Sequence, residues 1–185
     1  MYRSIMSGVL VAALSTISRS QEPTTNSIAH FPRVEGSNLE GENLVLPADF
    51  KGKLNVVLIA FKREQQRDVD SWLPFLNSLA KSRSDVRIYE VPTLGRRYKV
   101  MRSFIDGGMR RGIPDKSVRE ATVTLYIDKA PFRRALQLAD EDRIYVVLVD
   151  QEGRVQWRAD GSFVEAAGAT LTRHLAQRDG GPDKT

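Results

Sequence analysis

The 185-residue sequence contains no cysteine. This absence excludes disulfide bonds, thiolate catalysis and metal sites built on cysteine ligands. Histidine is also scarce: His30 lies near the N-terminus and His174 in the last predicted helix, so neither is placed to form a nucleophile–base pair. With no other catalytic constellation in the sequence, we expect a protein that is not an enzyme and that carries no cofactor or metal ion.

Long hydrophobic runs are almost absent. The stretch from Ile5 to Ile17 carries no charge, but it is too short to cross a membrane comfortably. It follows Arg3 and precedes Ser18-Arg19-Ser20, an arrangement that predicts a signal peptide over residues 1–20 with cleavage before Gln21. We therefore expect an exported protein, periplasmic or extracellular, that is not an integral membrane protein after cleavage. The alternative is a mitochondrial transit peptide, because the segment has arginine and serine but no acid.

The excess of one charge sign is small. The chain has 28 basic and 23 acidic residues, a net charge of +5. Removing Arg3 and Arg19 with the first twenty residues leaves 26 against 23, or +3. This balance indicates a mixed-charge surface, and we expect no nucleic-acid partner. With 41% hydrophobic residues, the length fits one domain with a sizeable core.

One stretch in the first half of the chain predicts a βα unit. Leu54 to Phe61 is a continuous apolar run typical of a strand buried on both faces. Lys62 to Arg67 is a short polar turn, and Asp68 to Leu79 has Val69, Trp72 and Leu76 at helical spacing. A buried strand, a short turn and an amphipathic helix together favour a parallel sheet.

The rest of the chain reads as further short elements. A polar linker over 21–37 leads into a hairpin over 38–46, with Leu44 to Leu46 as its edge strand. In the middle of the chain we predict a strand over 86–92 ended by Pro92, a helix over 95–106 stopped by Gly107-Gly108 and a strand over 121–127. A short helix that begins near Pro131 and an acidic loop over 140–142 follow. The last predicted elements are strands over 144–149 and 154–158, a helix over 163–175 and a frayed tail over 179–185.

This order resembles the thioredoxin-like superfamily, in the form seen in peroxiredoxins. In that superfamily an aromatic residue ends the strand, a Cys-x-x-Cys opens the helix and a proline follows. When Phe61 and Pro74 are placed on those landmarks, the cysteine positions fall on Gln66 and Val69. The resemblance covers residues 38–178 and implies an α/β thioredoxin-like domain, with a central mixed β-sheet flanked by helices, an N-terminal hairpin and a peroxiredoxin-type insertion.

The redox chemistry of that superfamily is absent from this sequence. Thiol peroxidases and disulfide exchangers need thiols, and this chain has none. The superfamily also carries a cis-proline before the strand that faces its active site, whereas here Ile144 is preceded by Asp140-Glu-Asp-Arg143 and the nearest upstream proline is Pro131. We therefore interpret Lys62 to Arg67 as a charged recognition surface. A peroxiredoxin-like enzyme with non-thiol chemistry is the alternative.

A narrower group of motifs points to one family. Asp70-Ser-Trp72, Gly112-Ile-Pro114, Asp142-Arg-Ile-Tyr145 and the G-x-V-x-W-x-x-x-G run from Gly153 to Gly161 resemble the mitochondrial ATP synthase Fo assembly factor family. That family consists of thioredoxin-like proteins that assist assembly of the membrane sector, and its fungal members act as chaperones for a membrane subunit. The short length and signal-like start of this chain indicate a bacterial exported relative.

The resemblance implies a binding or assembly-assisting module with a protein partner, which we expect to be a membrane-protein subunit. Basic residues at 62–67, at 96–102 and at Arg110-Arg111 favour an anionic ligand or an acidic partner surface. We expect one face to bind the partner, formed by Lys62 to Trp72, Arg110 and Arg111, and the 140–143 loop. The candidate partner-binding residues are Lys62, Arg63, Gln66, Arg67, Asp70, Trp72, Arg110, Arg111, Arg143 and Trp157.

Overall fold

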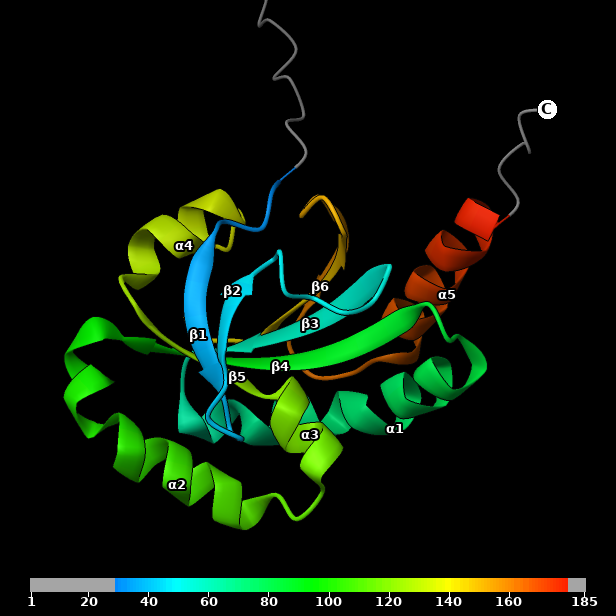
Figure 1. Cartoon of the computed structure of the whole chain (residues 1–185). Coiled ribbons are helices and arrows are strands. Elements are labelled where there is room, and N and C mark those ends of the chain that lie inside the picture. Colours follow the sequence, from blue (N-terminus) through cyan, green and yellow to red (C-terminus); the bar gives the residue numbers. More distant parts are fainter. Residues whose placement is uncertain (1–28, 180–185) are drawn as a thin grey trace, which may run out of the picture.

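A seven-stranded mixed sheet forms the centre of the protein (Figure 1). The computed structural model describes residues 29–179, so the predicted signal peptide and its cleavage site, most of the predicted linker and the end of the tail lie outside the described residues. In spatial order the strands are β2 (Asn43–Leu46), β1 (Val34–Asn38), β5 (Val123–Ile127), β4 (Val86–Gly95), β3 (Leu54–Ala60), β6 (Tyr145–Asp150) and β7 (Val155–Asp160).

Within residues 29–179, two 3-10 helices and five α-helices surround the sheet. They are η1 (Arg63–Gln65), α1 (Gln66–Ser82), η2 (Arg96–Met101), α2 (Arg102–Gly112), α3 (Lys116–Ala121), α4 (Lys129–Ala135) and α5 (Glu165–Asp179). This arrangement confirms the predicted α/β thioredoxin-like fold with a mixed sheet.

The strand β3 occupies the middle of the sheet, as its continuous apolar run predicts. It pairs in parallel with β4 and antiparallel with β6. Its side chains alternate between two cores: Val57 and Ile59 pack with the N-terminal hairpin and α4, whereas Val56 and Leu58 pack with α1 and α5. Both faces of β3 are therefore covered, which explains why its sequence is apolar throughout.

The N-terminal hairpin starts earlier than predicted. The edge strand Leu44 to Leu46 is confirmed within β2, but its partner β1 begins at Val34, inside the predicted linker. Phe31 is also buried, and its backbone N–H donates to the Gly153 carbonyl at 2.7 Å. The polar composition of this segment concealed a strand whose other edge pairs with β5.

Two predicted element ends in the middle of the chain are wrong. Pro92 does not end β4, because the following residues, Thr93 to Gly95, pair with β5. Gly107-Gly108 does not stop the helix, and α2 continues to Gly112. Each glycine costs a helix interior about 1 kcal/mol relative to alanine, which weakens a helix without forbidding it.

The helix α3 has no counterpart among the predicted elements. The Asp115 side chain caps its start by accepting a hydrogen bond from the Ser117 backbone N–H at 2.8 Å. The predicted helix near Pro131 and the last helix are confirmed as α4 and α5, with Phe132 and Leu171 buried.

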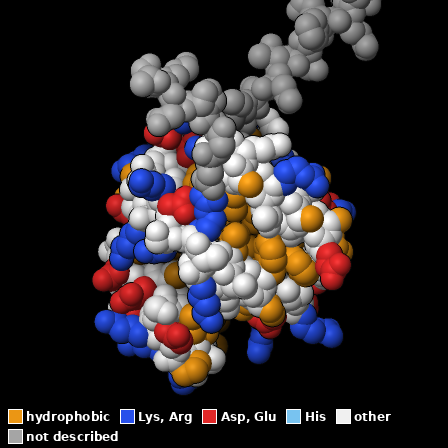
Figure 2. Space-filling model, turned by 90° about the vertical axis from the view of Figure 1, so that its right-hand side faces the viewer, with side chains coloured by type: hydrophobic (Ala, Val, Ile, Leu, Met, Phe, Trp, Pro, Cys, Tyr) orange, Lys and Arg blue, Asp and Glu red, His pale blue; other side chains and the backbone are white. Residues whose placement is uncertain are grey.

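The helices α1 and α5 lie together on one face of the sheet. The Phe75 and Phe163 rings stack with centroids 5.2 Å apart, and both line a shallow groove that continues along α5 past Gly168. Figure 2 shows hydrophobic side chains in the middle of the face that carries α5 and the end of α1.

Candidate functional site

The predicted recognition surface lies at the carboxyl end of β3. There the chain forms the charged turn, which we define as Lys62 to Arg67, and it faces the acidic loop, defined as Asp140 to Asp142, that leads into β6. The two segments are neighbours because β3 and β6 are antiparallel partners, with Ile59 opposite Tyr145. The carboxyl ends of sheet strands are where open α/β sheets place their sites.

Gln65 is the buried centre of this region. Its side chain is 4% exposed, and its Oε1 accepts hydrogen bonds from the backbone N–H groups of Phe61 at 2.8 Å and Lys62 at 3.1 Å. Its Nε2 donates to the Glu141 carbonyl at 2.8 Å. One amide thus fixes the conformation of the charged turn and ties it to the acidic loop. The sequence analysis missed this residue, since a glutamine in a polar turn carries no signal of burial.

Ion pairs also hold the acidic loop, and one of them joins it to the charged turn. Lys62 Nζ lies 2.6 Å from Asp142 Oδ1, and this carboxylate raises the pKa of Lys62. Glu141 is held by Lys129 and by Arg133, the latter at 3.4 Å. The acidic loop is therefore neutralised by this chain's own bases.

Arg143 continues this network toward the last strand. Its guanidinium lies 2.9 Å from Asp160 Oδ2 at the end of β7 and 3.4 Å from Asp140 Oδ2. The side chain is half exposed, so it can still be reached by a partner. The structure thus places Lys62 and Arg143 on either side of the acidic loop, as the sequence analysis expected.

The rest of the charged turn is open to solvent. Arg63 and Arg67 are exposed, and within residues 29–179 neither forms an ion pair. Gln66 is also exposed and donates to Asp70 Oδ1 at 3.0 Å. Of the two positions that correspond to cysteines in the superfamily, Gln66 therefore lies at the surface, whereas Val69 is buried in the core. These arginines are exposed cations of the site, and they lie beside an exposed acid, Glu64.

Trp72 is not a contact residue, which corrects its assignment as a candidate for partner binding. Its side chain is fully buried, and its Nε1–H donates to the Gly161 carbonyl at 2.9 Å. The Phe163 ring meets it edge to face with centroids 5.2 Å apart. Trp72 faces inward because α1 turns its apolar stripe toward the sheet.

Trp157 is half buried, so its role in partner binding stays a prediction. Its ring packs edge to face against Trp72, 6.3 Å between centroids, and its Nε1–H donates to Thr170 Oγ1 at 3.2 Å. Gly161 then turns the chain with a φ of +74°, a conformation that glycine adopts without strain. The G-x-V-x-W-x-x-x-G motif thus joins β7 and α5 to α1, which is a structural role.

The expectation that Arg110 and Arg111 share one face with the charged turn stays a prediction. The helix α2 carries Arg110 to within 3.5 Å of Glu40, in the turn after β1. The last residue of β1, Asn38, pairs with Val123 of β5, next to the bridge between Thr122 and Glu90 of β4. Glu90 also pairs with Leu58, so this end of β1 is level with the carboxyl half of β3, and β1 lies three positions from β3 in the strand order.

Glu90 is a second residue that the sequence analysis missed. It lies half buried in β4, near Asp70 and Gln66 of the first turns of α1. Burial raises the pKa of Glu90, the nearby Asp70 carboxylate raises it further, and a hydrogen bond from Gln66 opposes both. A carboxylate in this position destabilises the fold once it ionises.

Replacing Glu90 by glutamine is therefore expected to stabilise the protein at neutral pH by on the order of 1 kcal/mol. Because the pKa of Glu90 is raised in the folded state, its destabilising effect is absent below the ordinary carboxyl pKa and grows as the pH rises through the folded-state value. Urea unfolding should show that Glu90→Gln raises the free energy of unfolding at pH 7.5 but not at pH 4. Glu64→Gln, at an exposed position, is the control, and an equal gain for Glu90→Gln at both pH values would refute the assignment.

Comparison with known proteins identifies the family to which this chain belongs. The family model described as ATP10 protein matches residues 24–176. The chain belongs to the ATP10 protein family. This finding confirms the resemblance to ATP synthase assembly factors. The motif residues that carry the resemblance include Ser71, Trp72 and Gly161, and the Trp72 indole donates to the Gly161 carbonyl. No curated protein matches the chain significantly.

Solved structures similar to this ATP10 family member share its fold at low sequence identity. The exposed lipoprotein thioredoxin Etrx1 of Streptococcus pneumoniae is 15% identical, with 78% of this chain and 99% of that chain covered and a TM-score of 0.52. BsSco, a member of the Sco family of cytochrome c oxidase assembly proteins, is 11% identical, with 81% and 95% covered and a TM-score of 0.53. The thioredoxin domain of a thiol-disulfide oxidoreductase from Bacteroides vulgatus is 18% identical, with 78% and 94% covered and a TM-score of 0.50.

These structural likenesses establish the thioredoxin-like fold of this ATP10 family member and nothing further about its activity. Within residues 29–179, no helix has the length and apolar character that a membrane crossing requires.

Proposed function

We propose that this ATP10 family member is a redox-inactive binding module that assists the assembly of a membrane protein complex. The observation that carries the proposal is the charged turn. Gln65 fixes it by three hydrogen bonds at the place where the fold's thiol chemistry is usually found, and Arg63 and Arg67 remain exposed beside it. A rigid turn with free guanidinium groups suits the recognition of acidic side chains.

The partner in this proposal is a protein, specifically a membrane-protein subunit that presents an acidic segment. Membership in the ATP10 family supports an assembly role, and BsSco offers an example of an assembly protein on the same fold. Export remains the proposed location, with the mitochondrion, which suits the family, as the alternative.

A photo-crosslinking residue at position 63 is expected to capture one dominant protein in the native host. The same residue at Lys81, exposed at the far end of α1, is the matched control and should capture no enriched protein. The double variant Arg63→Glu/Arg67→Glu, with the crosslinker at Gln66, should reduce the yield of that product by at least about threefold, because charge reversal at an interface rim slows association.

Equal capture from positions 63 and 81 would contradict the binding module. Peroxide turnover or insulin reduction by the purified chain above that of a heat-inactivated sample would contradict its redox inactivity. Neither measurement requires knowledge of the complex that is assembled.

A further inference from the structure

The excess positive charge of this protein is concentrated in one short segment, residues 96–112, which forms η2 and α2. It contains six basic residues and one acid, Asp106. The whole chain has 28 basic and 23 acidic residues, so the remainder has 22 of each and no net charge. The net charge of +5 therefore belongs entirely to η2 and α2.

The same segment exposes most of the large apolar side chains that lie at the surface. Val100 is 92% exposed, Phe104 73% and Met101 49%. No residue of α2 is fully buried. Single exposed apolar residues are ordinary, but three within five positions form a patch that calls for a partner.

The segment has two distinct faces. Toward the sheet, Arg102 lies 3.3 Å from Asp106, and the Tyr126 hydroxyl of β5 donates to the same carboxylate at 2.8 Å. Burial raises the pKa of Tyr126, and the hydrogen bond to Asp106 raises it further. The only acid of the segment is thus turned inward and neutralised.

The opposite side is the outer face, which we define as Arg97, Val100, Met101, Phe104 and Arg111. Arg97, Val100, Met101 and Phe104 include pairs three or four residues apart, and Arg111 follows Phe104 by seven, so they follow one side of the helical segment. Apolar side chains occupy its middle and exposed arginines its two ends. Figure 1 shows α2 at the outer edge of the molecule.

We propose that the outer face lies on the surface of a bilayer that contains anionic phospholipids. Phe104, Met101 and Val100 enter the boundary between headgroups and acyl chains, while the arginines at both ends contact lipid phosphates. An amphipathic helical segment with aromatic and aliphatic side chains on one side, flanked by lysine and arginine, has the chemistry of interfacial membrane binding. The absence of any outward acid in the segment suits a negatively charged surface.

A neighbouring pocket adds basic groups to the same region. It has a volume of about 470 Å³ and is lined by Arg33, Arg96 and Lys99 together with one acid, Glu35. Arg96 and Lys99 come from η2 and Arg33 from the chain just before β1. An excess of two positive charges in this pocket favours a phosphate headgroup beside the inserted side chains.

Because the chain lacks cysteine, single engineered cysteines can report on this contact without interference. The full chain is labelled with an environment-sensitive fluorophore at Val100→Cys and, as a matched control, at Val164→Cys, an exposed valine just before α5. Vesicles of phosphatidylcholine with 30% phosphatidylglycerol, about that fraction being typical of an anionic leaflet, should shift the emission at position 100 to shorter wavelength. The emission at position 164 should stay constant.

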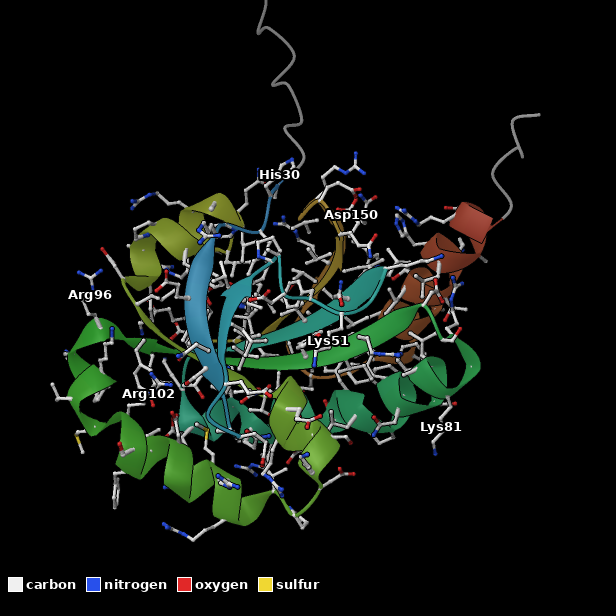
Figure 3. The ribbon with its side chains drawn as sticks, viewed as in Figure 1. His30, Lys51, Lys81, Arg96, Arg102 and Asp150 are labelled. Carbon is white, nitrogen blue, oxygen red and sulfur yellow. The ribbon has the colours of Figure 1, made fainter. Side chains whose placement is uncertain are left out.

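Variants test the two components separately by vesicle flotation. Val100→Ser/Phe104→Ser should lower the partition coefficient by about tenfold or more through lost apolar insertion. Arg97→Gln/Arg111→Gln should lower it by about tenfold on anionic vesicles and reduce its salt dependence. Lys81→Gln, on the opposite side of the molecule from Arg96 in Figure 3, should bind like the unmodified chain.

An unshifted emission at position 100, an equal shift at both labelled positions, or equal binding to neutral and anionic vesicles would each overturn the proposal. The last two results would assign vesicle binding to another part of the chain or to apolar adsorption alone. Crosslinking of a protein from position 100 without any vesicle binding would likewise assign the face to a protein partner. Lipid binding by the purified chain requires no assembly partner, so failure here leaves the proposed assembly role open to its own test.

Discussion

Replacement of Trp72 by alanine is expected to destabilise the fold by about 3–5 kcal/mol, the range for loss of a large buried aromatic side chain. Trp72 is fully buried between the sheet and α1. Its removal leaves a cavity next to Phe163 and Trp157, and it also leaves the Gly161 carbonyl without its hydrogen bond. The cost is large because α1, β7 and the start of α5 all meet at this side chain.

The measurement is urea unfolding monitored by circular dichroism, since the chain has only one other tryptophan, Trp157. Trp72→Phe keeps an aromatic ring but loses the indole donor, so its free energy of unfolding should lie between the values for the unmodified protein and the alanine variant. Trp157→Phe, at a half-buried position, should cost less than either change at Trp72. A loss below about 1 kcal/mol for Trp72→Ala would contradict the core role and restore the contact interpretation.

Gln65→Leu is expected to cost about 2–4 kcal/mol, although leucine fills a similar volume. The substitution leaves the backbone N–H groups of Phe61 and Lys62 and the Glu141 carbonyl without their side-chain partner. Unsatisfied polar groups in a buried setting are penalised because water cannot replace the lost partner. The charged turn should also separate from the acidic loop.

Gln66→Leu is the matched control, because the adjacent glutamine is exposed and its side chain bonds Asp70 and Glu90 and not the backbone of the turn. It should lower the free energy of unfolding far less than Gln65→Leu does. Amide hydrogen exchange at Phe61 supplies a second readout, and only Gln65→Leu should accelerate it. If Gln65→Leu unfolded at the same urea concentration as Gln66→Leu, Gln65 would not be the residue that fixes the turn.

These two residues divide the former redox region into a part that holds the fold and a part that faces outward. Trp72 and Gln65 are buried and hold α1 and the turn in place. Arg63 and Arg67 are exposed on that rigid base. The separation explains how a chain without thiols can keep a thioredoxin-like βα unit: the scaffold interactions never depended on the cysteine positions.

The sequence by itself determined the fold of this protein. The apolar run from Leu54 to Phe61, the helical spacing of Val69, Trp72 and Leu76, and the turn at Gly161 follow from local periodicity and backbone preference. Such patterns can be recognised in a sequence because the apolar residues of one buried face recur at regular spacing along the chain. The absence of cysteine likewise excluded thiol chemistry without any coordinates.

Only the tertiary structure decided which polar and aromatic residues are available to a partner. Trp72 and Arg63 both belong to the predicted recognition stretch, yet one is buried and the other exposed. Arg110 and Lys62 were expected on one face, and the structure shows that each is paired with its own carboxylate, Arg110 with Glu40 and Lys62 with Asp142. Burial and proximity depend on how elements distant in sequence pack, and no local pattern records that packing.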